Sequence, residues 1–131
     1  MREIGIYCEI HPHTITDAAL KALQPAGIIL SGGPESVTEE NTPRAPASVF
    51  TLGCPVLGVC YGMQTMAVQL GGSVIAGAKR EFGSAAVRLN KTSNLLKQLV
   101  ATDVLNVWMS HGDQVQEVPP GFSIKIGRAH V

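Results

Sequence analysis

Hydrophobic and polar positions alternate along the first half of the chain in blocks that predict strands and helices in turn. The apolar run at residues 2–10 predicts a short strand. Residues 14–24 carry apolar side chains at helical spacing, with Thr16 or Asp17 as the expected N-cap. Residues 26–34 form another apolar run, which ends in a glycine-rich loop. The first three elements are therefore expected to be a strand, a helix and a strand.

The same order continues to residue 72. Residues 46–53 predict a short helix, and residues 55–60 predict a buried strand. Residues 61–70 predict another helix, which ends at the glycine pair 71–72. Alternating strands and helices are typical of a parallel sheet that is covered by helices. The pattern therefore favours the α/β class.

Beyond residue 72 the pattern changes to short, valine-rich segments, which predict strands added at one edge of the sheet. Residues 93–100 predict one more helix. The polar stretch at residues 35–46 predicts a loop within the domain and not a linker between domains. The valine-rich segments are residues 73–77, 84–90 and 104–110.

The composition narrows the class of protein. At 131 residues the chain fits one small domain. Its 10 basic and 10 acidic residues form no long block of one sign, which argues against nucleic acid or an anionic membrane as a partner and leaves a small neutral or zwitterionic ligand open. No apolar run approaches the ~18 residues that span a bilayer, and the N-terminus lacks a signal-peptide pattern. A cytoplasmic protein is expected.

The cysteines and histidines do not form a convincing metal site. Cys8, Cys54 and Cys60 are an odd count without C-x-x-C spacing, so neither a disulfide framework nor a thiolate zinc site is predicted. His11 and His13 lie close together in the sequence, but with no third ligand nearby a solvated loop is favoured. Free thiols and no metal are therefore expected.

Cys60 stands where the strand at residues 55–60 meets the helix that begins at Tyr61. Gly58 and Gly62 flank it in a G-x-C-x-G pattern, the cysteine form of the turn that exposes a nucleophile between a strand and a helix. A helix N-terminus stabilises both a thiolate and the negative charge that develops on an attacked carbonyl oxygen. Cys60 is therefore a candidate nucleophile, with the amide of Tyr61 as a donor to the oxyanion.

Three loops are expected to meet at the carboxyl ends of the strands, where open parallel sheets bind ligands. They are residues 31–36, the turn at Cys60, and residues 109–113. The amide of Gly33 in the first loop would be a second oxyanion donor. Simpler interpretations exist: Cys60 as a small core side chain, the glycine loop as an ordinary turn, and His111 as a loop histidine with one structural hydrogen bond.

A likeness to a known family rests on four segments between residues 31 and 115. They read SGGPESVTEENTPRAP, PVLGVCYGMQTMAVQLGG, REFGSA and VWMSHGDQV. Together they resemble the class I glutamine amidotransferase family, and specifically the glutaminase part of the GMP synthases. The likeness runs from about Arg2 to Ile124, and it implies an incomplete doubly wound, mostly parallel sheet of the flavodoxin-like kind with helices on both faces. Related glutaminases typically have C-L-G where this chain has C-Y-G.

The resemblance also implies an activity. Glutamine would be hydrolysed through a cysteinyl thioester, and the ammonia would pass to a synthetase domain or subunit that uses ATP and Mg²⁺ to aminate XMP to GMP. The glutaminase domain itself would need no cofactor, and the whole enzyme would be a homodimer.

By position in the family pattern, Cys60 would be the nucleophile, and the amides of Gly33 and Tyr61 would form the oxyanion hole. Gln64 lies one helical turn after Cys60, on the same face of the helix, and would contact the bound substrate. The amino-acid end of glutamine would be held by Ser110, Gly112 and Asp113.

The chain departs from the family pattern at the catalytic base and at both ends. Family members carry the base in an H-P-E triplet, whereas none of the four histidines here is followed by Pro-Glu. Slow acylation of Cys60 and almost no turnover are therefore expected of this chain alone. Met1 stands where a family helix should be finishing, and residues 125–131 leave the family pattern. These features suggest a partial domain at residues 1–124 with a non-native tail, prone to self-association through open strand edges.

Two other functions stay open. A non-catalytic glutamine-binding or regulatory module would keep the fold and the pocket without hydrolysis. A related hydrolase or chaperone-like protein with a cysteine at the same turn would also fit, although Gln64 and residues 109–113 argue against it because those positions serve a free amino acid substrate.

Overall fold

The computed structural model describes residues 1–89, 95–96 and 104–128. The helix predicted at residues 93–100 falls almost wholly outside the described residues, and so does His130. The elements in chain order are η1 (Arg2–Ile4, a 3₁₀ helix), α1 (Asp17–Leu23), β1 (Ile28–Leu30), η2 (Ala47–Phe50, a 3₁₀ helix), β2 (Val56–Gly58), α2 (Tyr61–Gln69), β3 (Ser73–Leu89), β4 (Val104–Glu117) and β5 (Ile126–Arg128).

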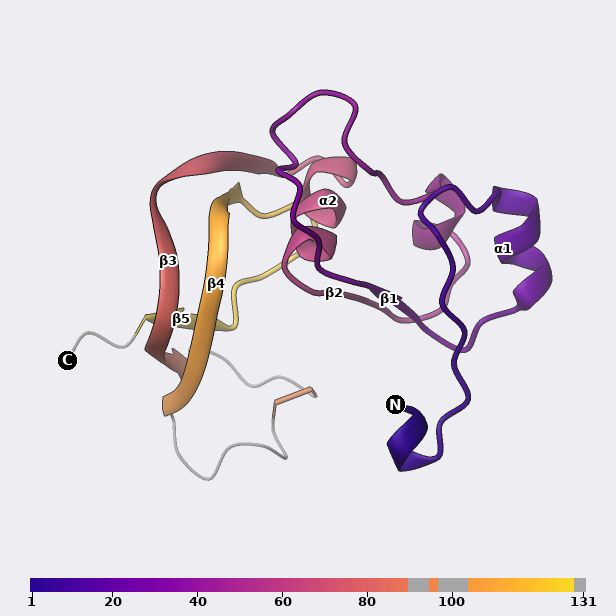
Figure 1. The fold of residues 1–131 in the computed structure, drawn as a ribbon, viewed down its shortest axis with the longest axis horizontal. Helices are drawn as coiled ribbons and strands as arrows, with labels where there is room; N and C mark the ends of the chain where they lie inside the picture. Colours follow the sequence, from indigo (N-terminus) through magenta and orange to yellow (C-terminus); the bar gives the residue numbers. More distant parts are fainter. Residues whose placement is uncertain (90–94, 97–103, 129–131) are drawn as a thin grey trace.

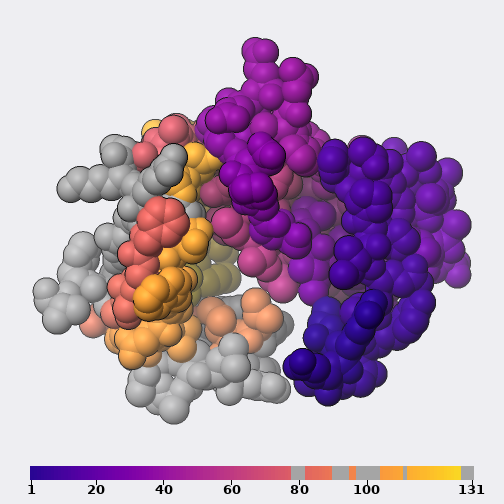
Figure 2. All heavy atoms as spheres, in the orientation of Figure 1, coloured from indigo at the N-terminus to yellow at the C-terminus, as the bar shows by residue number. Residues whose placement is uncertain are grey.

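Helix α2 lies between two small sheets (Figure 1). Strands β1 and β2 pair in parallel, with Ile28 opposite Val56. The second sheet has the order β4-β3-β5, and both of its pairs are antiparallel. Helix α2 contacts β1 and β2 on one side and β3 and β4 on the other. In the space-filling view the indigo N-terminal residues lie on the right, and the orange residues of β4 lie on the left (Figure 2). Helix α2 therefore lies where β1 and β2 come together with β3 and β4, which are far from them in the sequence.

Several elements form where the sequence predicts them. Thr16 is the N-cap of α1, and its Oγ1 accepts a hydrogen bond from the amide of Ala19 at 3.2 Å. The predicted strands at residues 26–34 and 55–60 appear as β1 and β2, and the predicted short helix at residues 46–53 appears as η2. Local capping and apolar periodicity are sufficient signals for these elements.

Asp17 links α1 to η2 and makes the stability of the fold depend on pH. The Ser48 side chain and the Ser48 amide, which donates a 2.8 Å hydrogen bond to Oδ1, both hold the pKa of Asp17 below its usual value. The contribution of Asp17 to the free energy of unfolding is therefore fully present above its unfolded pKa of about 3.9. It is lost as the pH falls through the lower pKa of the folded state. We expect Asp17→Asn, which keeps the acceptor oxygen, to show a shallower fall in melting temperature below pH 4 than the parent chain. Equal slopes in thermal melts across this range would contradict the assignment.

The prediction of a strand at residues 2–10 is wrong. The segment instead forms η1, which ends at Gly5 with a left-handed φ of 76°, and then runs without regular structure. A strand needs a neighbour that takes up its backbone hydrogen bonds, and no strand in the described part of the chain pairs with this segment. Ile4 and Ile10 consequently remain exposed.

The valine-rich region forms a long hairpin in place of the predicted short edge strands. Strand β3 runs through both predicted segments without a break, and it pairs with β4 from Ser73 opposite Glu117 to Arg88 opposite Val104. The register shifts between Ala76 and Glu81, where the pairing is irregular. Residues 109–113 therefore lie within β4, and the prediction that they form a loop at the end of a parallel strand is wrong. Antiparallel pairing satisfies the backbone groups of these polar residues without any help from local propensity.

The core is concentrated around α2. Tyr61, Thr65 and Ala67 of this helix are buried, together with Val37 of the polar loop. On the opposite face of the β1/β2 pair, the side chain of Ile29 is 49% exposed, and the described residues leave this face largely open. The best-packed part of the molecule is consequently the part that holds the start of α2.

Candidate active site

Cys60 occupies a strained turn between β2 and α2. Its φ and ψ are 51° and −114°, a region that residues with a side chain rarely adopt, and it stands at the N-cap of α2. The amide of Gly62 donates to the carbonyl oxygen of Val59 at 2.9 Å and closes the turn. This is the geometry of a strand-to-helix nucleophile turn, as the G-x-C-x-G pattern predicts.

The two glycines of the pattern are required by close backbone approach. A Cβ on Gly62 would overlap the carbonyl group of Leu30 in β1. A Cβ on Gly58 would lie 2.7 Å from the Cα of Met63. The helix can therefore start directly against β1 and β2 only because both positions lack a side chain.

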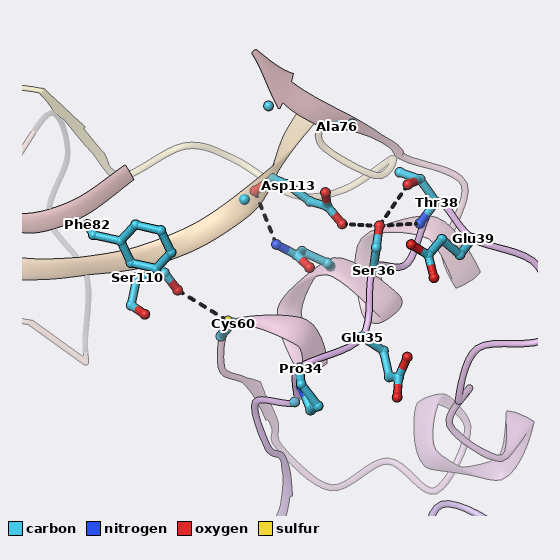
Figure 3. Close-up of a pocket in the computed structure, with 14 residues that line it drawn as sticks. Pro34, Glu35, Ser36, Thr38, Glu39, Cys60, Ala76, Phe82, Ser110 and Asp113 are labelled. Carbon is cyan, nitrogen blue, oxygen red and sulfur yellow. Dashed lines mark hydrogen bonds between the residues drawn. The ribbon is translucent and has the colours of Figure 1, made fainter. Parts of the chain in front are cut away.

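The three predicted segments line one cavity of about 530 Å³ (Figure 3). Residues 33–36 come from the glycine loop, Cys60 and Gln64 come from the start of α2, and Ser110, Gly112 and Asp113 come from β4. The structure thus brings six of the predicted site residues together at the cavity even though the third segment belongs to a strand; Tyr61 is not among the lining residues.

Two hydrogen bonds tie the start of α2 to β4. The thiol of Cys60 donates to the carbonyl oxygen of Ser110 at 3.7 Å, and the Nε2 of Gln64 donates to the carbonyl oxygen of Asp113 at 3.2 Å. Gln64 is only 4% exposed, so its amide is held at the wall of the cavity. The bond that the structure gives to the Cys60 thiol therefore leads to a backbone carbonyl and not to an imidazole.

Gly33 and Tyr61, whose amides are the proposed oxyanion donors, are neighbours in the structure. The amide of Tyr61 is the first of α2, where an N–H has no acceptor within the helix. Gly33 faces the Tyr61 ring: a Cβ built on Gly33 would lie 3.8–4.0 Å from its atoms. Tyr61 follows Cys60 in the chain and Gly33 lines the same cavity as Cys60, and their role as oxyanion donors remains a prediction.

Sequence reasoning missed a second set of polar groups at the cavity. Ser36 Oγ donates to Asp113 Oδ2 at 2.5 Å and lies 2.7 Å from Thr38 Oγ1 (Figure 3). Glu39 and Phe82 also line the cavity. The sequence signal that could have indicated these groups is the polarity of the loop at residues 35–46. Polarity alone does not show that the loop approaches β4.

The charged residues that line the cavity are acidic, namely Glu35, Glu39 and Asp113. An excess of carboxylates favours a ligand that carries an ammonium group. Within the described ranges, no group of three or more His, Cys, Asp or Glu side chains is arranged to hold a metal ion. In the same ranges, no helix is long and apolar enough to cross a membrane.

Comparison with known proteins agrees with this geometry. The sequence model of the family described as "Glutamine amidotransferase class-I" matches residues 1–130. The chain belongs to this family.

It is 58% identical over 127 residues to the glutamine-hydrolysing GMP synthase of Vibrio vulnificus strain YJ016, covering 97% of this chain and 24% of that protein. It is also 58% identical over 130 residues to the enzyme of the same name from Methylococcus capsulatus, covering 95% of this chain and 25% of the relative. The chain thus spans about a quarter of the length of these curated relatives.

Solved structures confirm the α/β fold of the chain. A GMP synthase subunit protein from Thermoplasma acidophilum matches with a TM-score of 0.76 and 27% identity over 98% of this chain and 63% of that one. A glutamine amidotransferase from Methylobacillus flagellatus matches with a TM-score of 0.61 and 24% identity over 80% of this chain and 44% of that one, which bears on the fold alone. The predicted fold class and family are therefore confirmed.

Proposed function

We propose that this chain is the glutaminase part of a GMP synthase and that Cys60 is its nucleophile. The observation that carries the proposal is the strained backbone of Cys60 at the head of α2, in a cavity that it shares with Gly33 and Gln64. The thiolate would attack the side-chain carbonyl carbon of glutamine to form a tetrahedral oxyanion, which the amides of Gly33 and Tyr61 would stabilise. Collapse would break the carbon–nitrogen bond, release ammonia after proton transfer, and leave a glutamyl thioester that water hydrolyses to glutamate.

The polar groups of the cavity suit the rest of the substrate. Glutamine carries an α-ammonium group and an α-carboxylate, and the acidic side chain of Asp113 would favour the former. Backbone groups at Ser110 and Gly112 would contact the same end of the molecule. Gln64 would exchange its present partner, the carbonyl of Asp113, for the substrate.

The ammonia would serve a synthetase domain or subunit, because the relatives at 58% identity are glutamine-hydrolysing GMP synthases about four times as long as the matched region. In that reaction ATP and Mg²⁺ would act at the synthetase part, where XMP is aminated to GMP. A homodimeric parent enzyme and a cytoplasmic location are part of the same proposal.

The chain by itself would acylate slowly and turn over very little. It contains no H-P-E triplet, and the thiol of Cys60 is hydrogen bonded to a backbone carbonyl. Cysteine tolerates the loss of a base better than serine because a few per cent of a free thiol is ionised at neutral pH, but hydrolysis of the thioester still needs an activated water.

One alternative is a glutamine-binding module that does not hydrolyse its ligand. This function would use the contacts among Gln64, Asp113 and Ser36, which the structure already holds in place. Binding of glutamine without any modification of Cys60 by a reactive analogue would favour the binding module.

A chloroketone analogue of glutamine tests the main proposal. We expect it to alkylate Cys60 in a saturable manner, with chloride as the leaving group, and we expect free glutamine to protect the thiol. Intact-protein and peptide mass spectrometry would locate the adduct, and an ammonia assay would measure turnover. Unprotected, non-saturable labelling would overturn the proposed function, whereas rapid glutamate production would overturn only the expectation of low turnover.

A further inference from the structure

The side chain of Tyr61 makes contacts that the role of its backbone amide does not explain. It is only 7% exposed, and its hydroxyl donates to the carbonyl oxygen of Pro43 at 2.6 Å. The same hydroxyl accepts a 3.0 Å hydrogen bond from Nη1 of Arg44. The Nη2 of Arg44 in turn donates to the carbonyl oxygen of Val37 at 2.9 Å. One phenol and one guanidinium therefore fasten the start of the loop at residues 35–46, at Val37, and its end, at Pro43 and Arg44, to the first residue of α2.

The start of this loop forms part of the cavity. Ser36 is bonded to the Asp113 carboxylate at 2.5 Å, and Glu39 lines the cavity beside it. At the far end, the Gln69 side chain accepts from the Ala45 amide at 3.0 Å and donates to the Ala45 carbonyl at 2.9 Å. The loop is thus held at both ends, and Tyr61 with Arg44 attaches it to the residue that follows Cys60 in the chain.

The Tyr61 ring also faces Gly33, since a Cβ at Gly33 would make ordinary contacts of 3.8–4.0 Å with it. The amides of these two residues are the proposed oxyanion donors. Because the ring is anchored through its hydroxyl, it is a fixed neighbour of the glycine loop, with space for a methyl group left beside Gly33. Hydrogen-bond donors stabilise an oxyanion well only when their positions are fixed before the reaction.

We infer that the Tyr61 side chain is a positioning residue for the glutaminase site. Its hydroxyl, together with Arg44, holds residues 35–46 and the glycine loop in the arrangement that places the Gly33 and Tyr61 amides toward the reacting carbonyl. This role rests on the proposed glutaminase function, and it belongs to the side chain, so it can be removed while the Tyr61 amide stays in place.

Tyr61→Phe is the direct test, with Tyr7→Phe as the matched control because Tyr7 is highly exposed and lies away from the cavity. We expect Tyr61→Phe to lower the maximum rate of Cys60 alkylation by the glutamine chloroketone by about tenfold, the effect of losing one hydrogen bond to a polar group. The concentration that gives half-maximal rate should change less than threefold, on the order of 0.6 kcal/mol or below. The rate with iodoacetamide, which needs no oxyanion hole, should stay within twofold of the parent chain, and Tyr7→Phe should alter none of these values.

A second readout follows the loop without any glutamine chemistry. Cleavage by a glutamate-specific protease after Glu39 or Glu40 should become about tenfold faster in Tyr61→Phe, because loosening the loop raises the fraction of time in which it is open to the protease. Arg44→Gln removes the guanidinium from the same cluster without a change in α2, so it keeps the test valid if Tyr61→Phe fails to fold.

The outcomes separate the two proposals. If the parent chain shows no saturable, glutamine-protected labelling, the proposed function fails and the role of Tyr61 in it fails as well. If the parent chain is labelled and both Tyr61→Phe and Arg44→Gln match it in alkylation and in proteolysis, the positioning role alone is overturned. Loss of chloroketone labelling with unchanged iodoacetamide labelling supports the role.

Discussion

Cys60→Ser should eliminate glutamine-directed alkylation and any residual release of ammonia, with a fall in rate on the order of 10³ or more. The serine hydroxyl is almost never ionised at neutral pH, and loss of the nucleophile in a complete hydrolase triad costs about 10⁶ in kcat. A smaller factor is expected here because the chain lacks the H-P-E base and starts from a slow rate. Rates of adduct formation by mass spectrometry and ammonia release under single-turnover conditions would measure the effect.

The other two cysteines provide matched controls. Cys8 and Cys54 are free thiols of intermediate exposure, and neither lines the cavity. Cys8→Ser and Cys54→Ser should retain saturable labelling and glutamine protection within about twofold, since a change of less than about 0.4 kcal/mol is typical of substitutions away from a site. Labelling of Cys60→Ser at the parental rate would show that the reagent reacts elsewhere and would remove Cys60 from the mechanism.

Gly62→Ala should destabilise the fold more than any other single methyl addition near the site, by about 3 kcal/mol. The new Cβ would overlap the Leu30 carbonyl, which is backbone and cannot rotate away as a flexible side chain does. Either α2 must move away from β1 or the turn at Cys60 must open. Chemical denaturation followed by circular dichroism would give the change in the free energy of unfolding.

Gly27→Ala is the control for this substitution. A Cβ at Gly27 would lie 3.5 Å from the carbonyl oxygen of Pro55, an ordinary contact at the end of the same β1/β2 pair. Its effect should stay within about 1 kcal/mol, the range expected for Gly-to-Ala changes without strain. Similar stabilities of Gly62→Ala and Gly27→Ala would contradict the close approach of α2 to β1, and with it the turn geometry assigned to Cys60.

Much of the site could be predicted from the sequence because its signals are local. A glycine on each side of a cysteine, between an apolar run and a helical pattern, is sufficient to predict the turn, since only short backbone distances are involved. Thr16 as a helix cap is equally local, because its hydroxyl reaches an amide three residues away. Ser36 was missed because its partner, Asp113, is 77 residues away in the sequence.

The sequence by itself determined the family, the strand-to-helix turn at Cys60 and the main helices, since each depends on neighbours within a few residues or on a recognisable motif. Only the tertiary structure decided that residues 2–10 form no strand and that residues 109–113 lie within one. The tertiary structure alone also decided that Tyr61 and Arg44 attach the loop at residues 35–46 to α2. Strand pairing and hydrogen bonds between distant segments depend on which backbone groups and side chains meet after folding, and local periodicity carries no information about those partners.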